Sequence, residues 1–218
     1  MKGKLRKRIA VVFLALAVLI ATGLFISTAP ASAQTIIEEW NSIKTPPPPE
    51  LKAVTVDPKT TALLVLDIIT QICNNERRPR CVASVPKIQG LLQQARAKGV
   101  TVIYSLAGQA TPADIFKEVA PIGGEPIVKS GSDKFLGTDL EKILKEKGIK
   151  TVIIVGTAAH GAVLYTASGA SLRGLQVIVP VEGMSAENPF IELYTVYNFS
   201  SSPATRSVTL TKMDMIKY

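Results

Sequence analysis

The chain has 218 residues, with 25 Lys and Arg against 17 Asp and Glu and a formal net charge of +8. Five of these cations lie in the first eight residues, so the rest of the chain carries 20 Lys and Arg against the same 17 acidic residues. The remaining cations are scattered and are not interleaved with aromatic residues. This distribution excludes a dedicated nucleic-acid-binding surface, and we expect no nucleic-acid partner.

The N-terminus has the three parts of a secretory signal peptide. A basic stretch at residues 1–8 precedes an apolar run at 9–26, and Ala31-Ser32-Ala33 places small residues at the positions that a signal peptidase reads. We therefore expect removal of residues 1–33 and export to a bacterial periplasm or the extracellular space. The alternative is an uncleaved signal that anchors the protein in a membrane through residues 9–26, and a membrane partner is expected only in that case.

The remainder of the chain is long enough for one domain. Removing 33 residues from 218 leaves 185, which supports one hydrophobic core of ordinary size. Residues 34–50 form an N-terminal tail that ends in a polyproline spacer. Residues 51–218 form the folded domain.

Short apolar runs typical of buried strands alternate with segments of helical spacing along this domain. In chain order the expected elements are a strand at 61–66, a helix at 84–98, strands at 100–106 and 125–128, a helix at 138–147, a strand at 151–155, a helix at 162–172, a strand at 175–179, a helix at 189–199 and a strand at 208–210. Thr138 and Glu141 have the spacing of a capping box at the start of the second helix. Strands separated by such helices predict an α/β fold with three layers, in which helices cover both faces of a mainly parallel sheet.

The chain has two cysteines, Cys73 and Cys81. In an oxidising compartment this pair is most simply a disulfide that closes the polar loop at 74–80. Zinc is a poor alternative, because the chain has one histidine and no second pair of cysteines.

Three separated segments end at the same edge of the predicted sheet. Asp67 ends the first strand, Lys129 follows the third, and residues 156–161 connect the fourth strand to the next helix. Ligands of parallel sheets bind beyond the carboxyl ends of the strands, so we expect the functional site at this edge. The alternative interpretations are that Asp67 caps a turn and that Lys129 is a solvated lysine.

The residues at this edge form a recognisable pattern. It consists of LVLD at 64–67, Lys129 ahead of Phe135 and a leucine-rich helix, and GTAAHGAVLYTA at 156–167. In this order and at these separations, the pattern resembles the isochorismatase-like cysteine hydrolases, which include nicotinamidases, N-carbamoylsarcosine amidases and isochorismatases. The resemblance extends over residues 61–179 and implies the three-layer fold of that family.

The resemblance also implies an Asp–Lys–Cys triad. In the family a thiolate at a helix N-terminus is the nucleophile, an aspartate is the general base, and a lysine helps to balance the charge. Asp67 matches the aspartate by position and Lys129 matches the lysine, whereas Ala162 stands at the position of the cysteine. A methyl group cannot attack a carbonyl, so acyl-enzyme chemistry of the family type cannot run with Ala162.

In the family, backbone amides at the start of this helix, often beside a non-proline cis peptide, form an oxyanion hole. The matching residues, which we expect to contact a ligand, are Ala158, Ala159, His160 and Gly161. His160 has the alternative interpretation of a loop side chain. Because no histidine lies near the first strand, the metal site of nicotinamidases is in doubt, and we expect no metal ion and no cofactor.

These residues support three hypotheses. The leading one is a pseudoenzyme that binds a small carboxylate- or amide-bearing molecule without turnover. The second is a hydrolase of a small amide or vinyl ether that uses Asp67 and Lys129 with Cys73 or an activated water, although a disulfide at Cys73 would remove the thiolate version. The third is an interaction module in which the tail at 34–50 docks on a partner. Because family members are often homo-oligomers, we also expect a homo-oligomer.

Overall fold

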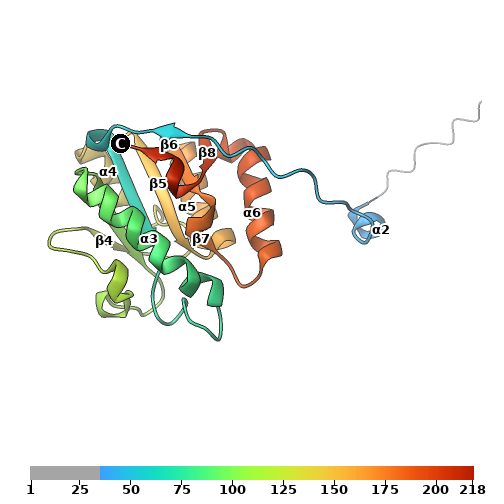
Figure 1. The fold of residues 1–218 in the computed structure, drawn as a ribbon, viewed down its shortest axis with the longest axis horizontal. Coiled ribbons are helices and arrows are strands. Elements are labelled where there is room, and N and C mark those ends of the chain that lie inside the picture. Colours follow the sequence, from blue (N-terminus) through green and yellow to red (C-terminus); the bar gives the residue numbers. More distant parts are fainter. Residues whose placement is uncertain (1–34) are drawn as a thin grey trace, which may run out of the picture. The chain divides into compact units, whose positions relative to one another are not determined.

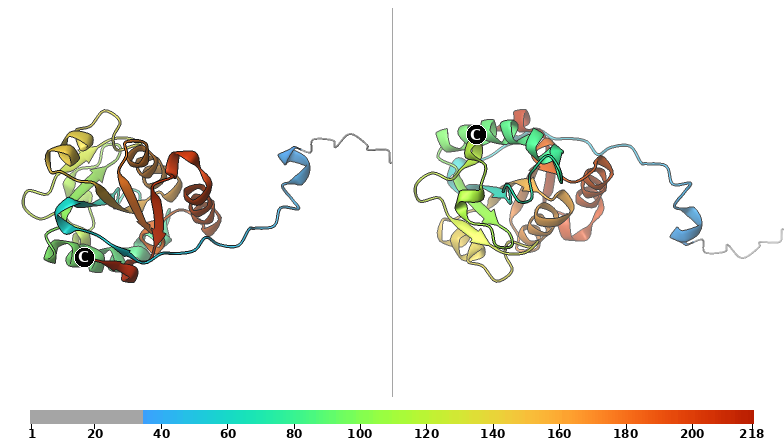
Figure 2. Two further views of the ribbon diagram at one scale, coloured as in Figure 1. Left: turned by 90° about the horizontal axis from the view of Figure 1, so that it is seen from above. Right: turned by 90° about the horizontal axis from the view of Figure 1, so that it is seen from below.

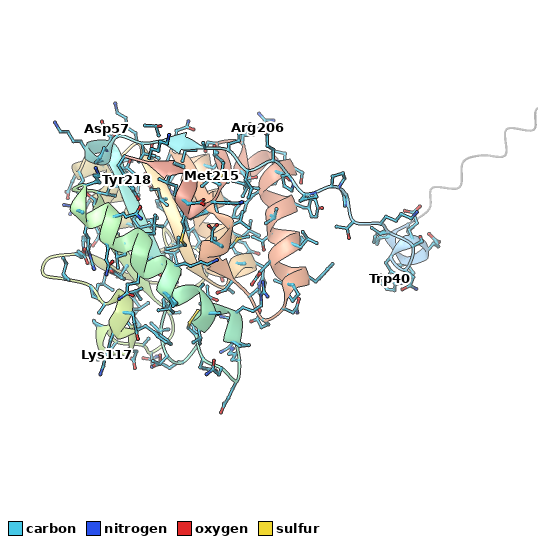
Figure 3. The ribbon with its side chains drawn as sticks, in the orientation of Figure 1. Trp40, Asp57, Lys117, Arg206, Met215 and Tyr218 are labelled. Carbon is cyan, nitrogen blue, oxygen red and sulfur yellow. A yellow bond between two sulfur atoms is a disulfide. The ribbon has the colours of Figure 1, made fainter. Side chains whose placement is uncertain are left out.

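The computed structural model describes residues 35–218, so the expected signal peptide lies outside the described residues. The chain divides into two compact units between residues 46 and 47. In the first unit, helix α2 (Ile36–Glu39) begins after Thr35, whose backbone N–H and hydroxyl both bond the Glu38 carboxylate. The large apolar side chains of this unit are exposed, including the labelled tryptophan in Figure 3; they are Ile36, Ile37, Trp40 and Ile43.

The second unit contains a seven-stranded sheet in which every strand pairing is parallel (Figure 1). Its strands are β2 (Thr61–Leu66), β3 (Thr101–Leu106), β4 (Ile127–Lys129), β5 (Thr151–Thr157), β6 (Gln176–Pro180), β7 (Met184–Ser185) and β8 (Val208–Thr211). The order across the sheet is β4-β3-β2-β5-β6-β8, and β7 pairs with the end of β5. A separate pair of short parallel strands joins β1 (Val54–Thr55) to β9 (Ile216–Lys217).

Helices cover both faces of the sheet (Figure 2). The α-helices are α3 (Pro79–Ala97), α4 (Leu140–Glu146), α5 (Leu164–Leu172) and α6 (Pro189–Ser201), and a π-helix, η4 (Ala159–Val163), leads into α5. Short 3₁₀ helices are η1 (Pro58–Thr60), η2 (Pro112–Asp114), η3 (Lys117–Val119), η5 (Val181–Gly183), η6 (Pro203–Thr205) and η7 (Met213–Met215). Alternate residues of β2 face opposite layers: Leu64 packs with α4, α5 and α6, whereas Leu63 and Val65 pack with α3. The predicted three-layer α/β fold is confirmed.

Two differences from the predicted elements have a clear cause. Helix α3 begins at Pro79, five residues before the predicted start, because proline is favourable in the first turn of a helix and Cys81 then lies inside the helix. Strand β7 was not predicted, since two residues carry no periodic pattern.

Within residues 35–218, no helix has the length and apolar character that crossing a membrane requires.

The strand order reverses between β2 and β5. From β2 the chain moves outward through β3 to β4, and it then returns to place β5 on the other side of β2. Binding sites of open parallel sheets form at such a switch point, beyond the carboxyl ends of the strands. In Figure 3, Asp57, which precedes β2, lies with Tyr218 at one end of the domain, and Lys117, which follows β3, lies at the opposite end. The segments that follow β2 and β5 leave the sheet at the Lys117 end.

Candidate functional site

Asp67 follows directly after β2, with φ of +53°, in a left-handed region that aspartate adopts more readily than most residues. Only 4% of its surface is exposed. Its Oδ1 accepts a hydrogen bond from Ser105 Oγ at 2.7 Å, and its Oδ2 accepts one from Lys134 Nζ at 2.7 Å. Ser105 lies opposite Leu66 in the β2–β3 pairing, so the sheet brings this hydroxyl to the carboxylate. The side chain of Asp67 is therefore a buried partner of two groups and not the cap of a turn.

The lysine beside Asp67 is Lys134, and not Lys129, which the family resemblance matched to the lysine of the triad. Lys129 ends β4 with its side chain exposed, because Val128 takes the buried position and successive residues of a strand face opposite sides. Lys134 is fully buried, and its Nζ also donates to the carbonyl oxygen of Ser130 at 3.1 Å. The two charges form a buried ion pair, in which each compensates the desolvation of the other.

Backbone hydrogen bonds hold Lys134 in place. Its N–H donates to Thr166 Oγ1 at 3.2 Å, so helix α5 fixes the loop that follows β4. Its carbonyl oxygen accepts from Thr138 Oγ1 at 2.5 Å. The same Thr138 oxygen accepts from Leu140 N at 3.2 Å, and the predicted capping box with Glu141 is not formed. Thr138 therefore bonds the loop that carries Lys134 and does not form a capping box with Glu141.

The environment of Asp67 shifts its proton affinity. Burial raises the pKa of the carboxyl above its ordinary value of 3.8, although the charge of Lys134 and the hydrogen bonds from Lys134 and Ser105 act in the opposite direction. The charge of Arg78 is a smaller cause that also opposes the rise of this pKa. A buried carboxyl group with these neighbours is suited to holding or transferring a proton.

The segment after β5 comes close to Asp67 at the switch point. Gly156 has φ of +136°, and a Cβ there would lie 2.1 Å from the carbonyl oxygen of Leu66, so only glycine allows the two strands to approach. The following Thr157–Ala158 peptide is cis, as the family resemblance implies. Ala162 lies in the π-helix η4 at the entry to α5 and is 4% exposed.

The four residues expected to contact a ligand lie together on this segment. Ala159 is fully buried, whereas Ala158, His160 and Gly161 are partly exposed. The carbonyl oxygen of Ala158 accepts from the N–H of Gly161 at 3.0 Å, which forms a tight turn ahead of α5. His160 Nδ1 is buried and has no hydrogen-bond partner among the described residues. An unpartnered buried nitrogen is a position at which a ligand can bond.

The predicted disulfide is present and closes the loop that leads into α3. Cys73 and Cys81 are bonded, and both are fully buried. The loop between them carries Arg78, which is 6% exposed and whose Nε donates to Glu187 Oε1 at 2.8 Å. Since Glu187 lies between β7 and α6, this contact joins the segment after β2 to the segment after β7.

Comparison with known proteins agrees with this geometry. The model of the isochorismatase domain matches residues 61–195, which include Asp67, Lys134 and Ala162. The chain belongs to the isochorismatase family. It is 27% identical over 145 residues to an N-carbamoylsarcosine amidase of Arthrobacter sp., covering 54% of this chain and 55% of the relative. It is 36% identical over 108 residues to the secreted isochorismatase effector Isc1 of Verticillium dahliae, covering 44% of this chain and 57% of the relative.

These two curated relatives are matched over just over half of their length. Among solved structures, an isochorismatase family protein from Desulfovibrio vulgaris superposes with a TM-score of 0.65 at 22% identity, covering 71% of this chain and 95% of that one. This similarity establishes a common fold for the isochorismatase domain.

Sequence reasoning missed four residues of the candidate site and its surroundings. Ser105 had a usable signal, because it is a polar residue inside an otherwise apolar strand pattern. Lys134 directly precedes the phenylalanine of the family pattern, yet its position five residues beyond β4 hides its return to β2. Arg78 and Glu187 are 109 residues apart, and neither has a local pattern that indicates its partner.

A surface cavity of about 660 Å³ lies elsewhere on the domain. It is bordered by α3 and the segment around η5, with Arg80, Lys87 and Glu182 among its lining residues. Asp67 is the centre of the candidate site, because the buried ion pair, the switch point and the family pattern coincide there. Within residues 35–218, no group of three or more His, Cys, Asp or Glu side chains is arranged to hold a metal ion.

Proposed function

We propose that this isochorismatase-family protein binds a small carboxylate- or amide-bearing molecule beside Asp67 and does not use the thiol chemistry of the family. The observation that carries the proposal is the buried Asp67–Lys134 ion pair. The family resemblance supports it, because it assigns the nucleophile position to Ala162. Burying two charges is costly, and we interpret the pair as a recognition element for a polar ligand that needs no accompanying nucleophile. The methyl group of Ala162 leaves the position chemically inert.

The cysteine inventory supports the absence of thiol chemistry. The chain has two cysteines, and the disulfide uses both Cys73 and Cys81. A disulfide sulfur is not a thiolate, so Cys73 does not supply a substitute nucleophile. The disulfide and the secreted relative also support export, which we propose for this protein.

A second candidate function is hydrolysis without a covalent intermediate, and the raised pKa of Asp67 favours it. A protonated carboxyl can give its proton to the double bond of a vinyl ether, after which water adds to the resulting cation. Collapse of the adduct then releases an alcohol and a carbonyl compound and returns a proton to the carboxylate. This route needs Asp67 and a water molecule but no residue at position 162.

The test compares binding and turnover for ligands drawn from the names of family members. N-carbamoylsarcosine, nicotinamide and isochorismate are titrated into the disulfide-intact protein by calorimetry, and product formation is followed by chromatography. We compare the native protein with Asp67→Asn, with Ala162→Cys, and with Ala97→Cys, which adds a thiol at an exposed position on α3 as a control.

We expect the native protein to bind without turnover, Asp67→Asn to bind more weakly, and only Ala162→Cys to gain hydrolysis. Turnover by the native protein that disappears in Asp67→Asn would replace the first candidate with the second. Absence of both binding and turnover across the panel would contradict both.

A further inference from the structure

Ser105 bonds Asp67 through both its backbone and its side chain. Its carbonyl oxygen accepts a hydrogen bond from the N–H of Asp67 at 3.3 Å, and its hydroxyl donates to Asp67 Oδ1 at 2.7 Å. The parallel pairing of β2 with β3 sets Ser105 opposite Leu66, the residue before Asp67, so both contacts follow from the register of the sheet. Ser105 therefore fixes the position of the carboxylate where the chain leaves β2.

The next residue of β3 supports the other half of the ion pair. The carbonyl oxygen of Leu106 accepts from the N–H of Ser130 at 3.2 Å, and the carbonyl oxygen of Ser130 accepts from Lys134 Nζ at 3.1 Å. Ser130 follows directly after β4, which pairs with β3. The carboxyl end of β3 thus holds Asp67 directly and holds Lys134 through one residue of the loop.

Packing alone does not account for a serine at this position of the sheet. The side chain of Ser105 is 1% exposed, and its neighbours on the same face of the sheet, Leu66 and Ile103, belong to a hydrophobic cluster. Burying a hydroxyl in such surroundings costs free energy unless the hydroxyl is hydrogen-bonded. Among the described residues, the acceptor of this hydroxyl is the Asp67 carboxylate.

The hydroxyl also affects the charge state of Asp67. A hydrogen bond donated to a carboxylate favours its ionised form, because the donor bonds a charged oxygen more strongly than a neutral one. For Asp67, burial raises the pKa, whereas the charge and hydrogen bond of Lys134, the hydrogen bond of Ser105 and the charge of Arg78 lower it. Ser105 is the uncharged member of this set, so it favours the carboxylate without adding a second cation to the buried pair.

Resting on the proposed function, we propose that Ser105 is a positioning residue that holds Asp67 ionised and oriented as the hydrogen-bond acceptor of the ligand. Among the described residues, Oδ1 accepts from Ser105 and Oδ2 accepts from Lys134, so each oxygen keeps a second lone pair for an N–H or O–H group of the ligand. Ser105 acts through Asp67. Its hydrogen bond opposes protonation of Asp67, and it therefore disfavours the second candidate function, in which the carboxyl gives up a proton.

The first measurement is the pKa of Asp67 itself, and it needs no ligand. The disulfide-intact protein, labelled with ¹³C at the aspartate carboxyl groups, is titrated by NMR, and the Asp67 signal is assigned by its loss in Asp67→Asn. The test variants are Ser105→Ala, which removes the hydroxyl, and Ser105→Thr, which keeps one. Ser84→Ala is the matched control, because Ser84 Oγ is a buried hydroxyl that donates at 2.7 Å to the backbone carbonyl of Cys81 and not to a carboxylate.

We expect Ser105→Ala to raise the pKa of Asp67 by about one unit, since removing a hydrogen bond to a charged group changes the proton affinity about tenfold. Ser105→Thr and Ser84→Ala should leave this pKa unchanged. The inference is overturned if Ser105→Ala leaves the pKa unchanged, or if Ser84→Ala raises it as much. Thermal unfolding checks the folding of each variant. Should Ser105→Thr not fold, the comparison of Ser105→Ala with Ser84→Ala still decides the question.

The second measurement connects this pKa to the ligand. Nicotinamide, which carries no carboxyl group, is titrated by calorimetry into the native protein and the same variants between about pH 4 and about pH 8. Affinity for a ligand that donates to the carboxylate is lost as pH falls through the pKa of Asp67, so the loss in Ser105→Ala should begin about one pH unit higher than in the native protein. An unmoved pH profile despite a raised pKa would show that the ligand does not bond the carboxylate, and the role of Ser105 would then be wrong.

Two further outcomes separate this inference from the function on which it rests. If the native protein binds neither nicotinamide nor N-carbamoylsarcosine, while Ser105→Ala raises the pKa of Asp67, the proposed binding function fails and the hold of Ser105 on Asp67 stands. If the native protein shows turnover that extends to higher pH in Ser105→Ala, the reaction uses the protonated carboxyl. Ser105 then opposes the activity of the site, and the inference is refuted.

Discussion

Replacing Lys134 by Met should strongly destabilise the protein, because the lysine is the buried partner of Asp67. The side chain of Lys134 is completely buried, and only 5% of the Asp67 side chain is exposed. The variant therefore leaves a carboxylate without its cation in a site that water barely reaches. Removing one partner of a buried pair costs about 3–5 kcal/mol, a large fraction of the roughly 5–15 kcal/mol that stabilises a typical domain. Replacing both partners, as in Lys134→Met with Asp67→Leu, should cost less than the single change.

The cost of Lys134→Met should depend on pH. Burial already raises the pKa of Asp67 above 3.8, and loss of the lysine removes the largest opposing cause, so the pKa of the folded state rises further. A raised pKa means that the folded state holds the proton more tightly than the unfolded state. The free energy of unfolding therefore falls as pH rises from about 4 to the new pKa, by up to about 1.4 kcal/mol per pH unit.

Urea unfolding followed by circular dichroism, at about pH 4.5 and about pH 8, measures both effects. Lys145→Met is the matched control, because Lys145 pairs with Glu141 on the surface with 74% of its side chain exposed, and such pairs contribute about 0–1 kcal/mol. The reasoning is refuted if Lys134→Met costs no more than the control, or if its cost is the same at both pH values.

Three further predictions concern the surroundings of the site. Gly156→Ala should cost at least about 3 kcal/mol, since its Cβ would lie 2.1 Å from the last carbonyl oxygen of β2. Gly90→Ala within α3 meets no atom within 4 Å and should stabilise the protein by up to about 1 kcal/mol. Thermal unfolding measures both variants, and equal stability of the two would contradict the prediction. Replacing Cys73 and Cys81 by Ala should lower the urea midpoint by an amount equivalent to about 2–3 kcal/mol, and an unchanged midpoint would show that the short loop needs no covalent closure. Thr166→Val should cost about 1–3 kcal/mol, because the backbone N–H of the buried lysine loses its acceptor, and hydrogen exchange at that amide should become faster; unchanged exchange would contradict the assignment.

Much of the candidate site could be predicted from local sequence. Asp67 could be placed at the end of a buried strand because a short, mainly apolar run at 61–66 precedes it. The segment at 156–162 could be placed because a strand, a glycine and a small-residue helix occur there in order. The disulfide was predictable from two cysteines eight residues apart. These features depend on short-range patterns that the chain carries in its own residues.

The identity of the lysine at the site was not predictable in this way. Lys129 ends the short strand β4 and Lys134 follows it, and the strand pattern alone does not say which of them turns back. Strand alternation directs Lys129 outward, and the hydrogen bond from the Lys134 backbone to Thr166 directs the other inward. That hydrogen bond joins residues 32 apart and exists only once α5 has packed against the sheet.

The sequence by itself determined the α/β class, the order of the strands and helices, the family, and the positions of Asp67 and Ala162 along the chain, because periodicity and motif spacing are local properties. Only the tertiary structure decided which side chains surround Asp67. Lys134 and Ser105 reach that carboxyl from a loop and a strand that are 67 and 38 residues away in the chain. The contact between Arg78 and Glu187 spans 109 residues. Such partners are selected by the parallel pairing of β2 with β3 and β5, which brings the ends of separate segments to one edge where buried charges must find each other.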